Sequence, residues 1–224
     1  AGQGYAVFLP NYRGSTGYGT AFSKQHQGDA AGKEFDDLVD AKKALVEMLV
    51  ADGDRVGVTG GSYGGYATAW SATRYSDEFA AGVMFVGISD LLSKLGTTDI
   101  PNEEFLVHAR AQPWDDFAFT LERSPITYAG QAETPLLIMH GEEDPRVSPT
   151  QSLELYRNIK LRQPDTPLRL VWYPGEGHGN AMAASRYDYN LRMMEWFDTY
   201  LKSGDRTAPV PAPRPDLMIE KDAE

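Results

Sequence analysis

The chain has 224 residues, 42% of them hydrophobic and 24% charged, enough for one globular domain with a sizeable buried core. Its 32 acidic residues outnumber its 21 Lys and Arg, and the net charge of −11, without a dense basic stripe, argues against a nucleic-acid partner. It contains no cysteine, which excludes a disulfide framework and thiolate chemistry but does not locate the protein in a compartment.

Strands and helices are predicted to alternate in the first part of the chain. The apolar run 5–9 is typical of a buried strand and is ended by Pro10; a loop rich in glycine and aromatic residues follows at 11–19. A helix is predicted from 33 to about 51, with an apolar stripe made of Leu38, Ala41, Leu45 and Met48. A β-branched run at 55–59 predicts a second buried strand, followed by a helix at 64–75 and a strand at 80–86.

The segment 88–130 is irregular and contains Pro101, Pro113 and Pro125. It is too long for a simple connection, so we expect it to form short helices of its own, as an insert near the site. The apolar run 79–88 is the longest in the chain and is far too short for a membrane span.

Beyond the insert, a buried strand is predicted at 135–139. The next helix has Ser148 as N-cap, Pro149 at its first position and Gln151 as the partner in a capping box. Its inward face is expected to carry Leu153, Tyr156 and Ile159.

A strand is predicted at 168–173, and the last helix carries an apolar stripe of Leu191, Met194, Phe197 and Leu201. We therefore divide the chain into a domain at 1–203 and a proline-rich tail at 204–224, which we expect to be mostly disordered. Alternating buried strands and helices indicate an α/β fold with a mainly parallel sheet, where ligands bind at the carboxyl ends of the strands.

The stretch Gly60-Gly61-Ser62-Tyr63-Gly64 fits the pattern G-x-S-x-G between a predicted strand and a predicted helix. Glycines on both sides of Ser62 allow a sharp turn with the hydroxyl at its tip, and the N–H groups of the following helix point toward developing negative charge. The alternative is a glycine-rich turn with an incidental serine.

Two further residues follow other strands at the same edge of the sheet. Asp144 comes after the strand at 135–139, and His178 comes after the strand at 168–173, flanked by Gly177 and Gly179. The order Ser, Asp, His is that of α/β-hydrolases, in which an imidazole accepts the serine proton and a carboxylate orients the imidazole. Glu142 and Glu143 compete with Asp144 for the acid role.

The other three histidines are assigned to structural roles. We expect His26 to be a solvated surface residue, His108 to pack within the insert, and His140 to make a structural hydrogen bond at a strand end. The histidines are widely scattered and no H-E-x-x-H occurs, so no metal site is expected. No G-x-G-x-x-G and no phosphate-loop lysine occur either, so no cofactor is expected.

Three blocks of sequence together resemble the catalytic domain of the prolyl oligopeptidase family, in particular its acylaminoacyl-peptidase and dipeptidyl-peptidase branches. They are residues 60–65 (GGSYGG), 140–147 (HGEEDPRV) and 175–179 (GEGHG), and the loop 11–19 (NYRGSTGYG) is a further landmark of the family. The resemblance implies an α/β-hydrolase fold and a serine peptidase without a cofactor, with Ser62 as nucleophile, Asp144 as acid and His178 as base.

The resemblance also implies roles for three neighbours of these residues. Tyr63 would donate its backbone N–H to the oxyanion, Arg146 would bind a carbonyl of the substrate, and Val147 would form a wall of the pocket beside the scissile bond. The substrate would be a short peptide.

The resemblance implies segments that precede the residues seen here. In the family, the second oxyanion donor lies in a loop before the strand represented by 5–9, and a β-propeller, usually N-terminal, restricts the site to short peptides. We therefore expect this chain to be a partial α/β-hydrolase domain that lacks its first strands. One of the missing strands is the one that, in the sheet of the family, lies between the strands represented here by 5–9 and 55–59. The propeller and these strands are expected in the full-length chain.

Two rival functions remain at this point. An esterase or lipase uses the same triad on the same fold, and a binding domain could keep the fold without activity, although an intact triad argues against it. The residue preference, the compartment and the oligomeric state are not determined by the sequence.

Overall fold

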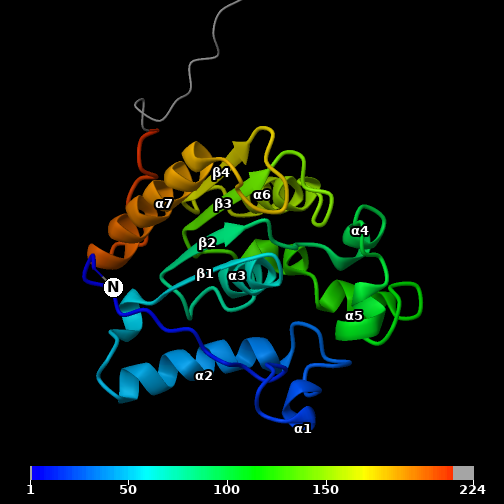
Figure 1. Cartoon of the computed structure of the whole chain (residues 1–224). Coiled ribbons are helices and arrows are strands. Elements are labelled where there is room, and N and C mark those ends of the chain that lie inside the picture. Colours follow the sequence, from blue (N-terminus) through cyan, green and yellow to red (C-terminus); the bar gives the residue numbers. More distant parts are fainter. Residues whose placement is uncertain (1, 214–224) are drawn as a thin grey trace, which may run out of the picture.

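A sheet of four parallel strands forms the centre of the computed structural model, which describes residues 2–213 (Figure 1). The strands are β1 (Gly57–Gly61), β2 (Ala81–Phe85), β3 (Leu136–Gly141) and β4 (Leu168–Tyr173), and they lie side by side in chain order. β2 and β3 are almost fully buried, as expected for central strands of a parallel sheet covered on both faces. The predicted α/β class and parallel sheet are confirmed.

Helices cover both faces of the sheet because successive strand residues point to opposite sides. Met84 and Ile138 face α3 (Tyr63–Thr73) and α6 (Thr150–Arg162), whereas Val83 and Leu137 face α7 (Ala183–Phe197). α2 (Lys33–Glu47) packs on α3 through a third cluster that is rich in aromatic residues. The remaining short elements are α1 (Thr20–Ser23), η1 (Gly53–Arg55), α4 (Leu91–Leu95), η2 (Glu104–His108), α5 (Phe117–Glu122), η3 (Pro125–Gln131) and η4 (Asp198–Lys202).

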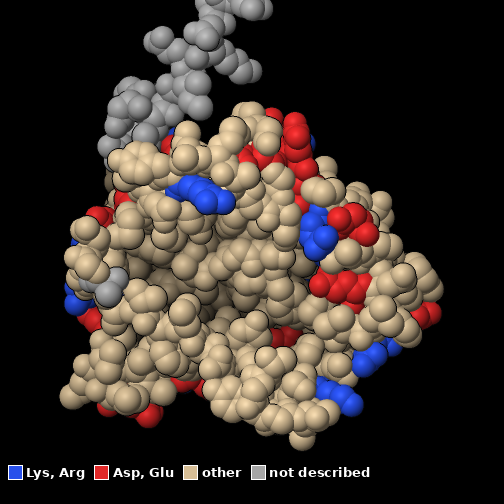
Figure 2. Space-filling view, in the orientation of Figure 1, with Lys and Arg blue, Asp and Glu red and all other residues tan. Residues whose placement is uncertain are grey.

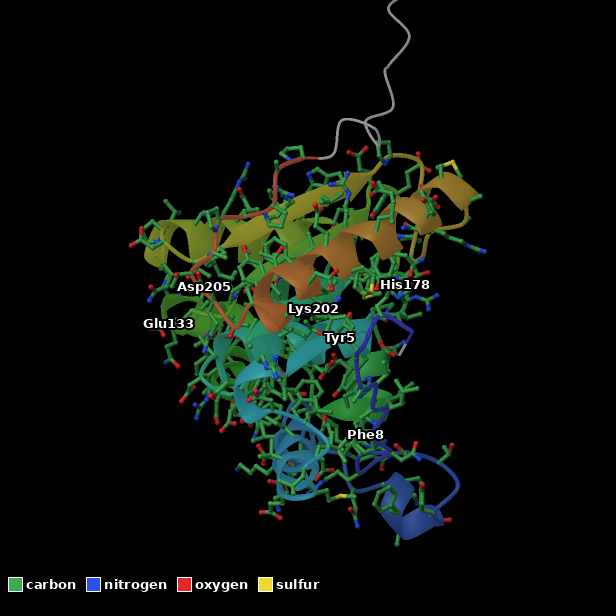
Figure 3. The ribbon with its side chains drawn as sticks, turned by 90° about the vertical axis from the view of Figure 1, so that its left-hand side faces the viewer. Tyr5, Phe8, Glu133, His178, Lys202 and Asp205 are labelled. Atoms are coloured by element: carbon green, nitrogen blue, oxygen red, sulfur yellow. The ribbon has the colours of Figure 1, made fainter. Side chains whose placement is uncertain are left out.

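The strand predicted at 5–9 is wrong. This segment belongs to no strand or helix, and Val7, Phe8 and Leu9 are 68%, 54% and 85% exposed. A strand forms only where a neighbour satisfies its N–H and C=O groups, and in the described part of the chain no strand pairs with 5–9. The segment is held at one end by Tyr5, whose hydroxyl donates to Asp198 at 2.6 Å and whose ring lies beside Lys202 (Figure 3).

Two predicted elements are present with changed limits. The strand predicted at 55–59 lies two residues further along, as β1, and is only half-buried because it is the edge strand of the described sheet. The helix predicted at 33–51 ends at Glu47; Phe35 and Val39 form its buried face, and Met48 is exposed.

The inward face of the last helix differs in part from the predicted stripe. Phe197, and Leu201 in the following η4, pack on the sheet as predicted, but Tyr189, Met193 and Trp196 replace Leu191 and Met194. Two of these three residues, Tyr189 and Trp196, are aromatic.

The insert at 88–130 folds into α4, η2, α5 and η3. Its start is fixed by Gln151 of α6, which is fully buried: the carboxamide oxygen accepts the backbone N–H groups of Ser89 and Asp90, both at 2.9 Å. The nitrogen donates to the hydroxyl of Ser93 at 2.6 Å. The capping box predicted for Ser148 and Gln151 is therefore wrong, because the tertiary contacts of Gln151 replace the local one.

Residues 204–213 contain no helix or strand, yet they lie against the body of the protein. Ala208 and Val210 pack on the α7 side of the sheet, and Arg206 donates to the carbonyl of Ser76 at 2.8 Å. The disorder predicted for the rest of the tail, 214–224, falls outside the described residues. Within residues 2–213, no helix is both long enough and apolar enough to cross a membrane.

Candidate active site

Ser62 occupies the sharp turn between β1 and α3. Its backbone angles are φ 59° and ψ −120°, a conformation that costs a residue other than glycine about 1–3 kcal/mol. Glycines make the turn possible: a Cβ on Gly60 would lie 2.5 Å from the carbonyl oxygen of Gly64, and one on Gly65 would lie 2.5 Å from that of Phe85. The close approach of α3 to the sheet thus holds the Ser62 hydroxyl at the tip of the turn.

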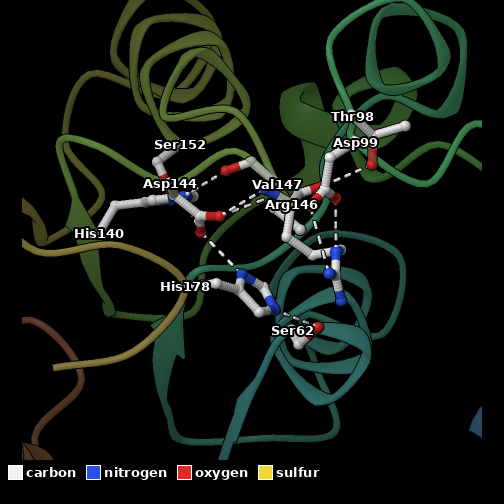
Figure 4. Close-up of polar contacts among 9 residues, drawn as sticks. All are labelled: Ser62, Thr98, Asp99, His140, Asp144, Arg146, Val147, Ser152 and His178. Carbon is white, nitrogen blue, oxygen red and sulfur yellow. Dashed lines mark hydrogen bonds and ion pairs between the residues drawn. The ribbon is translucent and has the colours of Figure 1, made fainter. Parts of the chain in front are cut away.

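His178 joins Ser62 to Asp144 through two hydrogen bonds (Figure 4). Its Nδ1 lies 2.7 Å from Asp144 Oδ2, and its Nε2 lies 2.8 Å from Ser62 Oγ. A carboxylate can only accept, so Nδ1 carries the proton and Nε2 is free to accept the serine hydroxyl. The arrangement can therefore take the proton from Ser62 while the carboxylate stabilises the imidazolium that forms.

The carboxylate of Asp144 is buried and has four hydrogen-bond donors around it. Oδ1 accepts the backbone N–H groups of Arg146 and Val147 at 2.9 and 3.0 Å, and Oδ2 accepts from His140 at 3.2 Å as well as from His178. Burial is the largest influence and opposes ionisation, but the bonds from His140, His178 and Val147 together hold the pKa of Asp144 well below its ordinary value. Of the three candidate acids, only Asp144 contacts His178; the side chains of Glu142 and Glu143 are exposed.

The loop that carries His178 is docked onto the loop that carries Asp144. A Cβ on Gly141 would lie 2.3 Å from the carbonyl oxygen of Gly177, so only glycine permits this approach. Glu176 is 1% exposed, and its carboxylate accepts the N–H groups of Ala181 and Met182 at 2.6 and 3.0 Å. Glu176 could not be identified from the sequence, because nothing in the local pattern shows that its carboxylate is buried and accepts two backbone N–H groups.

Tyr63 is the first residue of α3, where backbone N–H groups have no partner within the helix. Its N–H therefore suits the stabilisation of negative charge beside Ser62. The side chain is held by two contacts: its hydroxyl donates to buried Glu34 at 2.7 Å, and its ring stacks on His108 with the centroids 4.3 Å apart. Burial raises the pKa of Glu34, although the bonds from Tyr63 and Ala31 oppose this shift.

A pocket adjoins Ser62, and both residues predicted for substrate binding lie on its wall. Val147 is buried, whereas the Arg146 side chain is 41% exposed. The pocket is lined by Ser62, Tyr63, Ile88, Lys94, Ile100, Glu103, Arg146 and Val147.

Hydrogen bonds and an ion pair join the insert at 88–130 to the loop that carries Arg146. The Arg146 guanidinium donates to Asp99 at 2.6 and 3.2 Å, and Thr98 donates to the Arg146 carbonyl at 2.7 Å (Figure 4). This ion pair could not be predicted from the sequence, since Asp99 and Arg146 lie 47 positions apart. The pair fixes the guanidinium beside the pocket.

Two other expectations concern histidines and metals. His26, expected to be solvated, is half-buried, with its ring 5.9 Å from that of His108. In the part of the chain that the structure describes, His, Asp and Glu side chains form no group of three or more that could hold a metal ion.

Comparison with known sequences finds relatives over nearly the whole chain. The family described as "Prolyl oligopeptidase family" matches residues 1–204. The chain is 40% identical over 195 residues to the dipeptidyl aminopeptidase BIII of Pseudoxanthomonas mexicana, a match that covers 85% of this chain and 28% of the relative. It is 34% identical over 208 residues to the acylamino-acid-releasing enzyme of Sus scrofa, covering 90% and 28%.

Solved structures agree with these sequence matches. A puromycin-hydrolyzing peptidase from Mycobacterium tuberculosis superposes with a TM-score of 0.78 at 30% identity, over 85% of this chain and 29% of that one. An acylaminoacyl peptidase from Pyrococcus horikoshii gives 0.74 at 30% identity, over 86% and 32%. The predicted α/β-hydrolase fold is confirmed, and the chain spans less than a third of the length of these relatives.

Proposed function

Because this chain belongs to the prolyl oligopeptidase family, we propose that it hydrolyses peptide bonds of short peptides through an acyl-enzyme on Ser62. The observation that carries the proposal is the continuous hydrogen-bond chain from Asp144 through His178 to Ser62, at the tip of a strained strand-to-helix turn. Relatives with peptidase names support the reaction class.

The first half of the reaction forms the acyl-enzyme. Ser62 Oγ attacks the scissile carbonyl carbon as its proton passes to His178 Nε2, and Asp144 stabilises the imidazolium. The negative charge that develops on the carbonyl oxygen is stabilised by the N–H of Tyr63. His178 then gives its proton to the leaving amine as the peptide C–N bond breaks.

The second half releases the product. A water molecule takes the place of the amine, gives a proton to His178 and attacks the ester carbonyl. The C–O bond to Ser62 breaks, the proton returns to Oγ, and the carboxylic acid product leaves.

The proposal assigns the pocket beside Ser62 to the residue before the cleaved bond, with Val147 as one wall. It assigns the Arg146 guanidinium to a carbonyl further along the peptide. The Asp99 ion pair supports this role, because it holds the guanidinium at the pocket without using all of its N–H donors.

We further propose that the full-length protein supplies a second oxyanion donor, additional sheet strands and a propeller that limits access to short peptides. The greater length of the relatives and the unpaired outer side of β1 in the described residues support this view.

The test of the nucleophile is covalent labelling. In the full-length enzyme, a fluorophosphonate probe should modify Ser62 and no other serine, as read by peptide mass spectrometry. Ser62→Ala should abolish both the labelling and the hydrolysis of an aminoacyl-arylamide. Labelling or hydrolysis that survives Ser62→Ala would refute the assignment.

A second experiment separates a peptidase from an esterase. If Arg146 binds a peptide carbonyl, Arg146→Ala should weaken kcat/KM for dipeptidyl arylamides by about 1.5–3 kcal/mol, the range for a hydrogen bond to a charged group. A small activated ester lacks that carbonyl and should be cleaved at nearly the same rate. Equal losses on both substrates would make Arg146 a structural ion-pair residue.

A further inference from the structure

A second imidazole lies on the carboxylate that orients His178. His140 is fully buried at the end of β3, and its Nε2 lies 3.2 Å from Asp144 Oδ2 and 2.8 Å from the carbonyl oxygen of Val147. Its Nδ1 lies 2.6 Å from the hydroxyl of Ser152 in the first turn of α6. The ring thus joins β3, the loop of Asp144 and α6 (Figure 4).

The partners of the ring determine where its proton lies. Both groups at Nε2, a carboxylate and a carbonyl, can only accept, so Nε2 must carry a hydrogen. That single hydrogen is shared between the Val147 carbonyl at 2.8 Å and Asp144 Oδ2 at 3.2 Å. The Ser152 hydroxyl can donate, and so Nδ1 accepts from it and every polar atom of the ring is satisfied with the ring neutral. A charged ring would add the cost of burying a second cation on a carboxylate that also serves His178.

We propose that His140 is a positioning residue of the triad, which donates from Nε2 to Asp144 and fixes the oxygen that Asp144 presents to His178. This inference rests on the proposed function. Backbone N–H groups anchor Oδ1 of the carboxylate, but among the described residues only the two histidines hold Oδ2.

The bond from His140 also weakens the partner that Asp144 offers to His178. A donor on Oδ2 withdraws electron density from that oxygen, so protonated His178 is stabilised less than it would be by an unshared carboxylate. Loss of the donor should have two effects: a less ordered carboxylate, which slows acylation, and a stronger hold on protonated His178, which moves the onset of activity to higher pH. The other charged groups near the carboxylate, Arg146 and Asp99, pair with each other, and a substitution at His140 removes a hydrogen-bond partner from neither.

The experiment compares two substitutions of His140 by carboxamide side chains of different length in the full-length enzyme. His140→Gln can place an N–H near the position of Nε2, whereas His140→Asn can reach Ser152 but not Asp144. The rate of fluorophosphonate labelling of Ser62 is measured from acidic to alkaline pH, together with kcat/KM for an aminoacyl-arylamide. Ser152→Ala is the control, because it alters the far side of the ring and leaves the donor to Asp144 in place.

For His140→Asn we expect the midpoint of the acid limb to rise by about 0.5–1 pH unit, part of the contribution of a hydrogen bond to a charged group. The limiting rate should fall about tenfold, well short of the loss on removing a triad member. His140→Gln should return both values toward the wild type, and Ser152→Ala should lower the melting temperature without moving the midpoint. If His140→Asn does not fold, His140→Phe takes its place with the same expected shift.

If the midpoint of the acid limb stays at the wild-type value in His140→Asn, the inference is overturned. Equal shifts of this midpoint in His140→Gln and His140→Asn would overturn it as well. Labelling needs no peptide substrate, so the two proposals can fail separately. An enzyme that is labelled but cleaves no peptide refutes the proposed function and leaves the pH profile as the test of His140. An enzyme that cleaves peptides with an unmoved midpoint refutes the role of His140 alone.

Discussion

At the scale of single residues, hydrogen bonding separates Asp144 from its acidic neighbours. Glu142 and Glu143 are exposed and make no side-chain hydrogen bond to the triad, while Asp144 is 5% exposed and accepts hydrogen bonds from two backbone N–H groups and two histidines. These donors offset the cost of burying the carboxylate and keep it ionised, which the stabilisation of an imidazolium requires. The position of a carboxyl group in this loop therefore decides its role.

Asp144→Asn should test this distinction. The amide keeps the shape of the side chain but removes the charge, and its NH₂ group cannot accept from His178, so the imidazole adopts the wrong tautomer. We expect kcat/KM for an aminoacyl-arylamide to fall about 10³-fold or more. Glu142→Gln and Glu143→Gln, measured as matched controls, should change it little. A large loss at Glu143 with none at Asp144 would reverse the assignment.

At the scale of elements, the sequence predicts best where local pattern and tertiary environment agree. β4 occupies the predicted residues, and β2, β3 and α3 lie within one or two residues of their predicted limits, because their runs of apolar and small residues are continuous and are buried in the fold. The three proposed triad residues could be placed at one edge of the sheet for the same reason: each lies in the turn or loop after a strand that was located to within two residues.

The failures have a common physical origin. The run at 5–9 has the composition of a buried strand, but composition does not supply the neighbour that a strand needs. Gln151 matches a capping box locally, yet its carboxamide binds residues about 60 positions away. Glu176 and Asp99 were missed because many acidic residues in the chain look alike until folding selects their partners.

Gln151→Met should show how much the link between α6 and the insert contributes. Methionine has a similar length but leaves the N–H groups of buried Ser89 and partly buried Asp90 without an acceptor. An unsatisfied buried donor costs about 1–3 kcal/mol, so we expect a loss of about 2–4 kcal/mol in the free energy of unfolding. Urea denaturation of the full-length protein measures it, and Gln131→Met, at an exposed position, is the control. If both variants unfold at the same urea concentration, the link is not a source of stability.

At the scale of the whole molecule, one side of the sheet is left open in the described residues. β1 pairs with β2 on one side only, and the extended segment with exposed Val7, Phe8 and Leu9 pairs with no strand. Figure 2 shows a hollow on this face, lined mostly by uncharged residues, in the region where Figure 1 places β1. Unpaired strand edges beside apolar side chains favour mispairing and aggregation.

Residues 1–224 expressed alone should therefore be poorly soluble and nearly inactive, although Ser62, Asp144 and His178 are all present. The additional strand that we propose would lie between segment 5–9 and β1 in the sheet. It would pair with the open edge of β1 and with segment 5–9, and it would cover Val7, Phe8 and Leu9. The loop attached to it would supply the second oxyanion donor. Loss of one such donor alone costs about 10²–10³ in rate. Thermal unfolding and hydrolysis of an aminoacyl-arylamide should be measured for residues 1–224 and for the full-length chain. We expect cooperative unfolding and turnover only from the longer chain; a cooperative transition and full activity from residues 1–224 would show that β1 needs no further partner.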